Sequence, residues 1–101
     1  MKSGKFSLKD TKRFDKGDFY GLVYFEQNGL EVMEIHVDGV HPEKLIDKVD
    51  TRMYRVEEGT GTFVIDGESY TAEPGDVFVI YKGGKYSYTG KMKMFEVNLF
   101  S

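Results

Sequence analysis

Hydrophobic and polar residues alternate in short runs along most of the chain. Residues 19–25 (FYGLVYF) are apolar at both alternating sets of positions, which indicates a strand with neither face made for water. The next run, residues 30–37, has two faces that differ sharply in polarity. Its apolar face holds Met33, Ile35 and Val37, and its polar face holds Glu34 and His36. We therefore expect a half-buried strand whose apolar face meets the core.

Turn residues separate these runs at short intervals. Asn28-Gly29 predicts a hairpin, because both residues tolerate positive φ. Asp38-Gly39 is expected to end the next strand, and an irregular stretch is expected over 40–50. Further turns are expected at residues 58–59, 66–67, 73–76, 82–85 and 90–91. Many short strands joined by tight turns indicate a β-sandwich or barrel.

The length of 101 residues fits one domain, and we take residues 1–18 as its polar N-terminal arm. Cysteine is absent, so disulfides and thiolate metal ligands are excluded. No apolar run approaches the roughly 18 residues of a membrane span, and the N-terminus has no apolar leader region. We expect a cytoplasmic protein with no membrane partner.

The charge balance argues against nucleic acid as a partner. The net charge is −3, and the lysines near the N-terminus are interrupted by Asp10, Asp15 and Asp18. No aromatic ladder for base stacking accompanies these lysines. We expect no nucleic-acid binding.

One long run of the sequence resembles a known family. Residues 54–84, YRVEEGTGTFVIDGESYTAEPGDVFVIYKGG, are similar to the central part of a cupin in their order of strands, Gly turns and Pro-Gly-Asp corner. The resemblance is plausible over about residues 19–100. It implies an all-β fold, the cupin-type double-stranded β-helix or jelly-roll barrel.

Cupins usually hold a divalent metal with three histidines and a glutamate. The resemblance places Leu45 and Asp47 at the first two histidine positions, Arg52 at the glutamate position and Tyr86 at the third histidine position. Small single-domain cupins that lack the metal set look similar to this chain. The resemblance therefore implies a barrel with no metal site and no cofactor.

The same alignment predicts a ligand pocket. Side chains at even spacing from an inward position also point inward, which brings Arg52 and Tyr54 together with Tyr86 and Tyr88, with Asp47 at the rim. A guanidinium and several phenols suit a small anionic or hydroxyl-rich ligand, such as a carbohydrate or an organic acid. Alternatively, the tyrosines only fill the barrel, and Arg52 pairs with one of three acidic residues, Asp47, Asp50 or Glu57.

We expect a metal-independent binding protein without catalysis, and we predict no catalytic residue. A metal-free sugar or sugar-phosphate isomerase or epimerase is the first alternative, with Tyr86 or Tyr88 acting beside His36 or a carboxylate. Its weakness is that no histidine falls at an inward motif position. A relocated metal site is a further alternative, built from Glu34, His36, Asp38 and His41.

The third class of function is an interaction module. The strand at residues 19–25 and the C-terminal run MFEVNLF carry apolar residues on both faces, which predicts a homodimer. Alternatively, the N-terminal arm folds back and covers the apolar strand with Phe6, Leu8 and Phe14.

Overall fold

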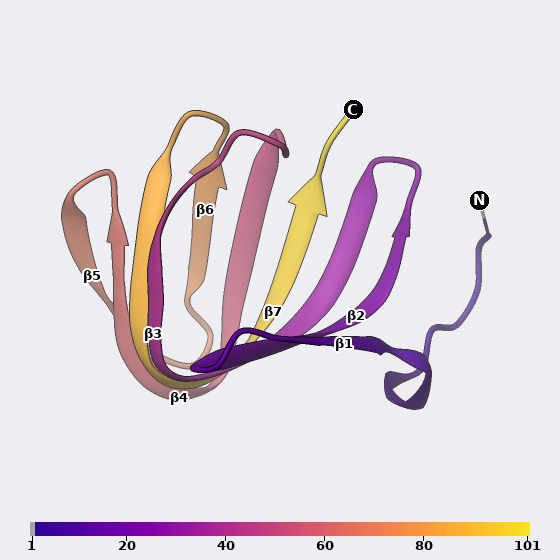
Figure 1. The fold of residues 1–101 in the computed structure, drawn as a ribbon, viewed down its shortest axis with the longest axis horizontal. Helices are drawn as coiled ribbons and strands as arrows, with labels where there is room; N and C mark the ends of the chain where they lie inside the picture. Colours follow the sequence, from indigo (N-terminus) through magenta and orange to yellow (C-terminus); the bar gives the residue numbers. More distant parts are fainter. Residues whose placement is uncertain (1) are drawn as a thin grey trace.

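The computed structural model describes residues 2–101, and nearly all regular structure in it is β-sheet (Figure 1). A short 3-10 helix, η1, spans Leu8–Asp10. Seven strands follow in chain order, and they are β1 (Lys12–Asp15), β2 (Phe19–Gln27), β3 (Leu30–Leu45), β4 (Thr51–Ile65), β5 (Glu68–Ala72), β6 (Val77–Tyr81) and β7 (Lys85–Leu99). The expected all-β fold is confirmed.

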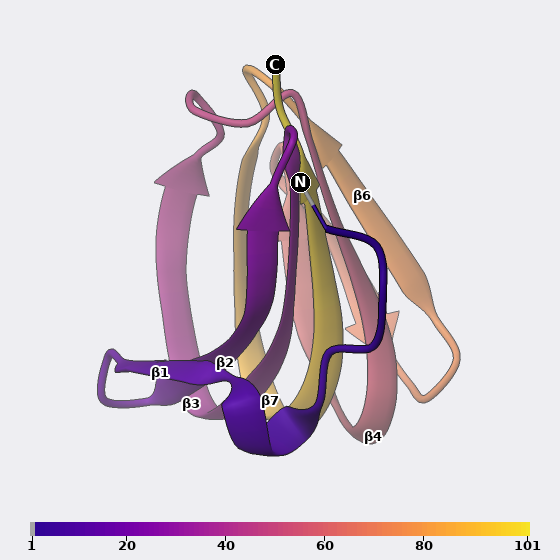
Figure 2. The same ribbon diagram turned by 90° about the vertical axis from the view of Figure 1, so that its right-hand side faces the viewer.

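The strands form one sheet in the order β1-β2-β3-β7-β4-β5, with β6 paired to β4. The long strands β3, β4 and β7 curve through a common bend, so that the sheet folds over on itself into a U-shaped barrel (Figures 1 and 2). Neighbouring pairs in this group are antiparallel along almost their whole length. One part of each long strand therefore lies in one wall of the barrel, and the other part lies in the opposite wall.

Three of the turns expected from the sequence are bends inside long strands. The residue pairs 38–39, 58–59 and 90–91 lie within β3, β4 and β7, which remain hydrogen-bonded across them. Gly59 has φ +81° and its Cβ position is 2.0 Å from the Lys91 carbonyl oxygen, so only glycine fits this close approach. Glycine thus bends the strand here without ending it, and the prediction of separate short strands was wrong at these places.

The core lies between the two walls of the barrel. Met33, Ile35 and Val37 are buried there, as their alternation predicted, and the largest fully buried side chains include Tyr54, Tyr86 and Tyr88. Several aromatic rings therefore fill the middle of the barrel.

Part of the predicted N-terminal arm belongs to the sheet. Residues 12–15 form β1, which pairs antiparallel with β2, and the Phe6 ring lies 4.6 Å from the Phe25 ring, centroid to centroid. The backbone amide of Lys2 donates to the side-chain oxygen of Gln27 at 2.9 Å. The arm therefore covers part of β2. Within residues 2–101, no helix is long and apolar enough to cross a membrane.

Candidate functional site

An inner cavity of about 180 Å³ lies between the walls of the barrel. Strands β1, β3, β4 and β7 contribute most of its lining. The polar groups at its centre are His41, Arg52, Tyr54, Tyr86, Tyr88 and Glu96. Because the volume of a water molecule is about 30 Å³, the cavity has room for about six waters, which is the scale of a sugar ring.

Four residues predicted from the sequence meet in this cavity. The hydroxyl groups of Tyr54 and Tyr86 are 2.8 Å apart, and Nη1 of Arg52 donates to the Tyr86 hydroxyl at 2.9 Å. Tyr88 lies beside them, with its ring centroid 5.6 Å from that of Tyr54. Residues on β4 and β7 thus point into a shared cavity, as their alternation predicted. Their role in ligand binding stays a prediction.

The fifth predicted residue lies at the edge. Asp47 is exposed and lines an adjoining hollow of about 310 Å³, which shares Lys44 and Arg52 with the inner cavity. Asp47 does not contact Arg52 through a hydrogen bond or an ion pair within residues 2–101. Leu45 is 47% exposed, so neither residue projects into the barrel.

Arg52 belongs to a buried network that the sequence did not reveal. Its Nε donates to Oδ1 of Asn98 at 2.7 Å and lies 3.5 Å from Oε2 of Glu96. Nδ2 of Asn98 donates to Oε2 of Glu96 at 2.7 Å and to Oε1 of Glu31 at 2.9 Å. The alternative pairing of Arg52 with Asp47, Asp50 or Glu57 was therefore wrong, because its acidic partner is Glu96.

This network stabilises the guanidinium in its charged form. Burial alone would lower the pKa of Arg52, but its interactions with Tyr54, Glu96 and Tyr86 raise it above its ordinary value. Burial also raises the pKa of the Glu31 carboxyl, although its hydrogen bond from Asn98 acts in the opposite direction. The charge of Arg52 is therefore already balanced by Glu96 inside the protein. This makes Arg52 a poorer anchor for an anionic ligand than the sequence suggested.

His41 is the main site residue that sequence reasoning missed. It is 8% exposed and lines the inner cavity, and its ring centroid lies 5.1 Å from that of Tyr86 and 4.7 Å from that of Tyr88. Nδ1 of His41 is 2.7 Å from the carbonyl oxygen of Pro42. A carbonyl oxygen only accepts hydrogen bonds, so Nδ1 carries the proton and Nε2 of the neutral ring does not.

Burial lowers the pKa of His41 below its ordinary value, which favours this neutral form. Its Nε2 has no hydrogen-bond partner among residues 2–101, yet no unpartnered side-chain nitrogen there is fully buried. Nε2 is therefore accessible and free to accept a proton.

The phenols around His41 can donate a proton, whereas its neutral imidazole can accept one. Burial raises the pKa of Tyr54, Tyr86 and Tyr88, so all three are protonated near neutral pH. A protonated phenol donates a hydrogen bond or a proton. The inner cavity thus combines one neutral imidazole base with several phenolic donors.

A signal for His41 was present in the sequence. Strand β3 runs to Leu45, through the Asp38-Gly39 pair that was expected to end it. Once the strand continues, His41 has the same parity as Ile35 and Val37 and must share their inward face. The assumed turn at residues 38–39 concealed this relation.

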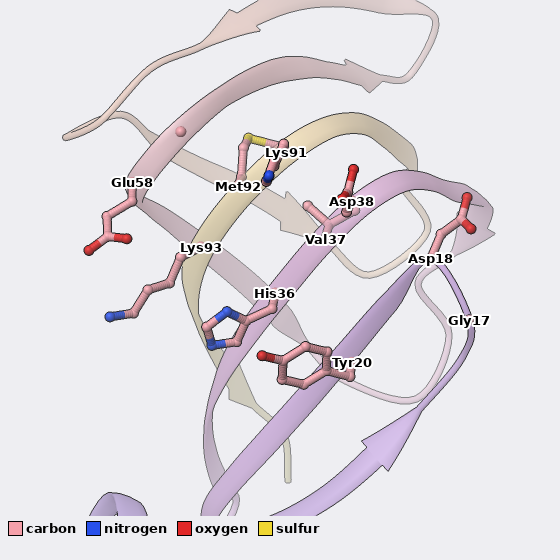
Figure 3. Close-up of a pocket in the computed structure, with 11 residues that line it drawn as sticks. Gly17, Asp18, Tyr20, His36, Val37, Asp38, Glu58, Lys91, Met92 and Lys93 are labelled. Atoms are coloured by element: carbon pink, nitrogen blue, oxygen red, sulfur yellow. The ribbon is translucent and has the colours of Figure 1, made fainter.

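A larger hollow of about 670 Å³ lies on the outer face of the sheet near its bend (Figure 3). The rings of Tyr20 and His36 stack there at 4.6 Å with an interplanar angle of 7°. Nε2 of His36 lies 2.7 Å from Oε2 of Glu34, whose Oε1 is 3.6 Å from Nζ of Lys93. This His36–Glu34 pair is only part-buried, whereas His41 is buried, so we place the candidate site in the smaller inner cavity.

The alternative metal group is not brought together. His36 lies on the outer face of β3 and His41 on the inner face, on opposite sides of the same strand. Within residues 2–101, no three histidine, aspartate or glutamate side chains gather as ligands for a metal ion. In the inner cavity the Arg52 guanidinium lies beside Glu96, where it would repel a cation. The residues present therefore do not fit the divalent metal that the fold suggests.

The chain is similar to known proteins both in sequence pattern and in fold. A family model described as a cupin domain matches residues 31–98, and no curated protein matches the sequence. Streptomyces Pac13, solved with uridine as a variant with glutamine in place of a histidine, matches with a TM-score of 0.87 and 20% identity, over 97% of this chain and 82% of that one. Pac13 is described as a unique nucleoside dehydratase.

Two other solved structures cover nearly the whole chain. KdgF from Halomonas sp. has a TM-score of 0.83 and 14% identity, over 99% of this chain and 96% of that one. An RmlC-like cupin from Shewanella frigidimarina has a TM-score of 0.81 and 16% identity, over 98% and 93%. At these identities the likeness shows the fold.

Proposed function

Because the chain belongs to the cupin family, in which one barrel carries many kinds of site, we propose its function from the inner cavity itself. We propose that this cavity binds a small hydroxyl-rich molecule of the sugar or nucleoside class without a metal. We further propose that His41 and the surrounding tyrosines catalyse proton transfer on that molecule, with elimination of water as the reaction.

The placement of His41 carries this proposal. Its Nδ1 is held by the Pro42 carbonyl oxygen at 2.7 Å, and its ring stacks on Tyr86 with an interplanar angle of 26°. These contacts fix both the tautomer and the orientation of the base, as a catalytic imidazole requires. A histidine that only filled space in the core would not need an accessible, unpartnered nitrogen, and His41 lines a cavity that has polar groups at its centre.

The residues suit a β-hydroxy carbonyl unit in the substrate. Nε2 of His41 removes the proton from the carbon next to the carbonyl group, whose electron-withdrawing effect acidifies that C–H bond. The electron pair forms a carbon–carbon double bond as the β-hydroxyl leaves. A neighbouring phenol, such as that of Tyr88, or the new imidazolium supplies a proton to the leaving group, which departs as water.

The fold neighbours support this choice of chemistry. Pac13 is described as a nucleoside dehydratase, and it was solved with uridine after substitution of a histidine or of either of two tyrosines. The numbers of these three positions are each one higher than those of His41, Tyr88 and Tyr54 in this chain. This agreement supports a dehydratase more strongly than an isomerase or a binding protein without catalysis.

The proposal is tested by measuring binding and turnover separately. Uridine binding is measured by isothermal titration calorimetry, and β-hydroxy aldehyde forms of sugars and nucleosides are followed by mass spectrometry for the loss of water. We expect His41→Gln to bind uridine within a few fold of the wild-type protein, and to lose turnover by about 100-fold or more.

His36→Gln is the matched control, because it replaces the other histidine, on the outer face of the same strand. It should leave both binding and turnover unchanged. If the wild-type protein binds no member of this ligand panel, the proposed function is wrong. If His41→Gln retains full turnover, the role of His41 as the base is wrong.

We also propose that two copies associate through the outer face of β4, β6 and β7. Met53 on β4 lies between Val79 on β6 and Val97 on β7 in the strand register. Six large apolar residues on this face are exposed, and they are Met53, Val77, Val79, Tyr81, Phe95 and Leu99. Contiguous apolar surface of this kind usually marks a partner site, and a mostly uncharged face can meet its own copy without repulsion.

A further inference from the structure

The side-chain amide of Asn98 holds two carboxylates together at one side of the inner cavity. Asn98 is fully buried, and its Nδ2 donates one hydrogen bond to Glu96 and one to Glu31. Its Oδ1 accepts from Nε of Arg52 at 2.7 Å. Because a guanidinium only donates and an ionised carboxylate only accepts, this arrangement fixes the orientation of the amide and uses all its hydrogen-bonding groups.

Each carboxylate keeps one oxygen free of this network. The bonds from Asn98 reach Oε1 of Glu31 and Oε2 of Glu96, and within residues 2–101 no protein group donates a hydrogen bond to the second oxygen of either one. No unpartnered side-chain oxygen in this part of the chain is fully buried, so both second oxygens are accessible. Both residues line the inner cavity.

The charges here do not balance within the network. Two carboxylates, Glu31 and Glu96, face a single guanidinium, that of Arg52, and the ion pair from Arg52 reaches Glu96. The exposed lysines that line the same cavity, Lys16 and Lys44, lie at its rim. A free carboxylate oxygen accepts a hydrogen bond from a hydroxyl group but repels a phosphate or a carboxylate.

We infer that Glu31 and Glu96 form a diol-recognition pair, so that the substrate is an uncharged molecule with two neighbouring hydroxyl groups, such as the ribose of a nucleoside. This inference rests on the proposed function and adds the substrate class to it. Asn98 and Arg52 act as positioning residues that hold the two acceptors side by side. Of the two kinds of ligand expected from the sequence, the anionic one would meet the wrong charge at this end of the cavity, and the hydroxyl-rich one would not.

The first test uses the unmodified protein and a series of ligands. Dissociation constants are measured by calorimetry for uridine, 2′-deoxyuridine and 3′-deoxyuridine. Each deoxy analogue leaves one carboxylate oxygen without its hydroxyl donor, so we expect each to bind about tenfold or more weakly than uridine. If both analogues bind within threefold of uridine, the diol inference is wrong, while the proposed function stands.

The second test replaces one acceptor. Glu31 is half-buried, and Glu31→Gln keeps its size while removing its charge and one acceptor oxygen. We expect this variant to bind uridine about tenfold more weakly and to discriminate against one of the two deoxy analogues by less than threefold. Glu43→Gln is the matched control, because Glu43 is exposed on the same strand and does not line the cavity.

These results separate the two proposals. Unchanged discrimination in Glu31→Gln, in a variant whose circular dichroism and melting temperature match the wild-type protein, overturns the diol inference alone. Failure of uridine and of both analogues to bind the wild-type protein overturns the proposed function and the diol inference with it.

Discussion

At the scale of single residues, the environment of His41 decides what the inner cavity can do. The ring stacks on Tyr86, packs against Tyr88 at a tilt and is held at Nδ1 by a backbone carbonyl. His36 lies on the outer face of the sheet instead, and its Nε2 contacts Oε2 of Glu34. The two histidines of this chain are thus in chemically different surroundings, although they lie five residues apart on one strand.

The stability of the protein should depend on pH through His41. Burial lowers its pKa in the folded protein, whereas the unfolded chain has an ordinary value of about 6.5. The unfolded state therefore binds the proton more tightly. The stabilisation from neutral His41 is complete above about pH 6.5, and it is lost as the pH falls from there towards the lowered pKa, by at most about 1.4 kcal/mol per pH unit.

Urea unfolding at a series of pH values checks this expectation. The slope of the unfolding free energy against pH just below about 6.5 should be smaller in His41→Gln than in the wild-type protein. His36→Gln makes the same substitution outside the barrel, and it serves as the reference. Equal slopes in the wild-type protein and His41→Gln would contradict the buried neutral imidazole.

Alternation in the sequence predicted four inward residues of the candidate site. It missed four others, which are Glu31, His41, Glu96 and Asn98. Arg52 and Tyr54, and likewise Tyr86 and Tyr88, are two residues apart on their strands, so one inward position determines the other. Glu96 and Asn98 have the same parity as Tyr86 and Tyr88 on β7, but the turn expected at residues 90–91 concealed this relation. Which of the inward residues meet across strands depends on register, which alternation does not supply. Glu31 meets Asn98, and Met33 meets Glu96, only because β3 and β7 pair in one particular register.

At the scale of the elements, the common bend of β3, β4 and β7 divides each strand into two parts, and these parts form the two walls of the barrel. Gly61 on β4 and Gly39 on β3 both pair with Gly90 on β7, so glycines of three neighbouring strands lie side by side at the bend. A Cβ on Gly90 would lie 2.5 Å from the Thr60 carbonyl oxygen. The backbones therefore approach one another here more closely than side chains would allow.

Gly59→Ala should destabilise the protein more than Gly67→Ala. Both glycines have similar positive φ, +81° and +84°, so both substitutions bring the left-handed backbone penalty of about 1–2 kcal/mol. Only Gly59 faces a backbone oxygen at 2.0 Å, while nothing lies within 4 Å of the Gly67 Cβ position. The clash in Gly59→Ala should lower the unfolding free energy by a further amount of about 1–3 kcal/mol. Urea unfolding of the two variants measures this difference.

Equal losses for Gly59→Ala and Gly67→Ala would mean that the strands at the bend separate easily. The comparison needs no further control, because the shared φ cancels between the two variants.

The sequence predicted the strands well and their ends less well. Asn28-Gly29 and Asp66-Gly67 are turns as expected, with positive φ at both residues of each pair. Gly59 and Gly90 also have positive φ, but they lie inside strands. A glycine that turns the chain and a glycine that bends a paired strand look alike in one sequence, because the difference lies in the neighbouring strands.

At the scale of the whole molecule, the outer face of β4, β6 and β7 predicts self-association. We expect sedimentation equilibrium at micromolar concentration to show a dimer of the 11.6 kDa chain. Val79→Glu should shift this equilibrium to the monomer, because it buries a new charge among the apolar side chains of the interface. Val79 is 41% exposed, so the folded monomer should tolerate the change.

Val40→Glu is the control for this experiment, since Val40 is 51% exposed and lies on a different strand, away from this face. It should leave the mass unchanged. A monomer for the wild-type protein, or a dimer that persists in Val79→Glu, would contradict association through this face.

The continuity of the long strands has a consequence for how a ligand enters. Because β3, β4 and β7 each pass through both walls, neither wall can swing away as a rigid flap without breaking ladder hydrogen bonds at the shared bend. Entry must therefore depend on side-chain rotation at the rim, where Lys16 and Lys44 are exposed. A cavity of this kind is preorganised, and ligand binding should cost little backbone entropy.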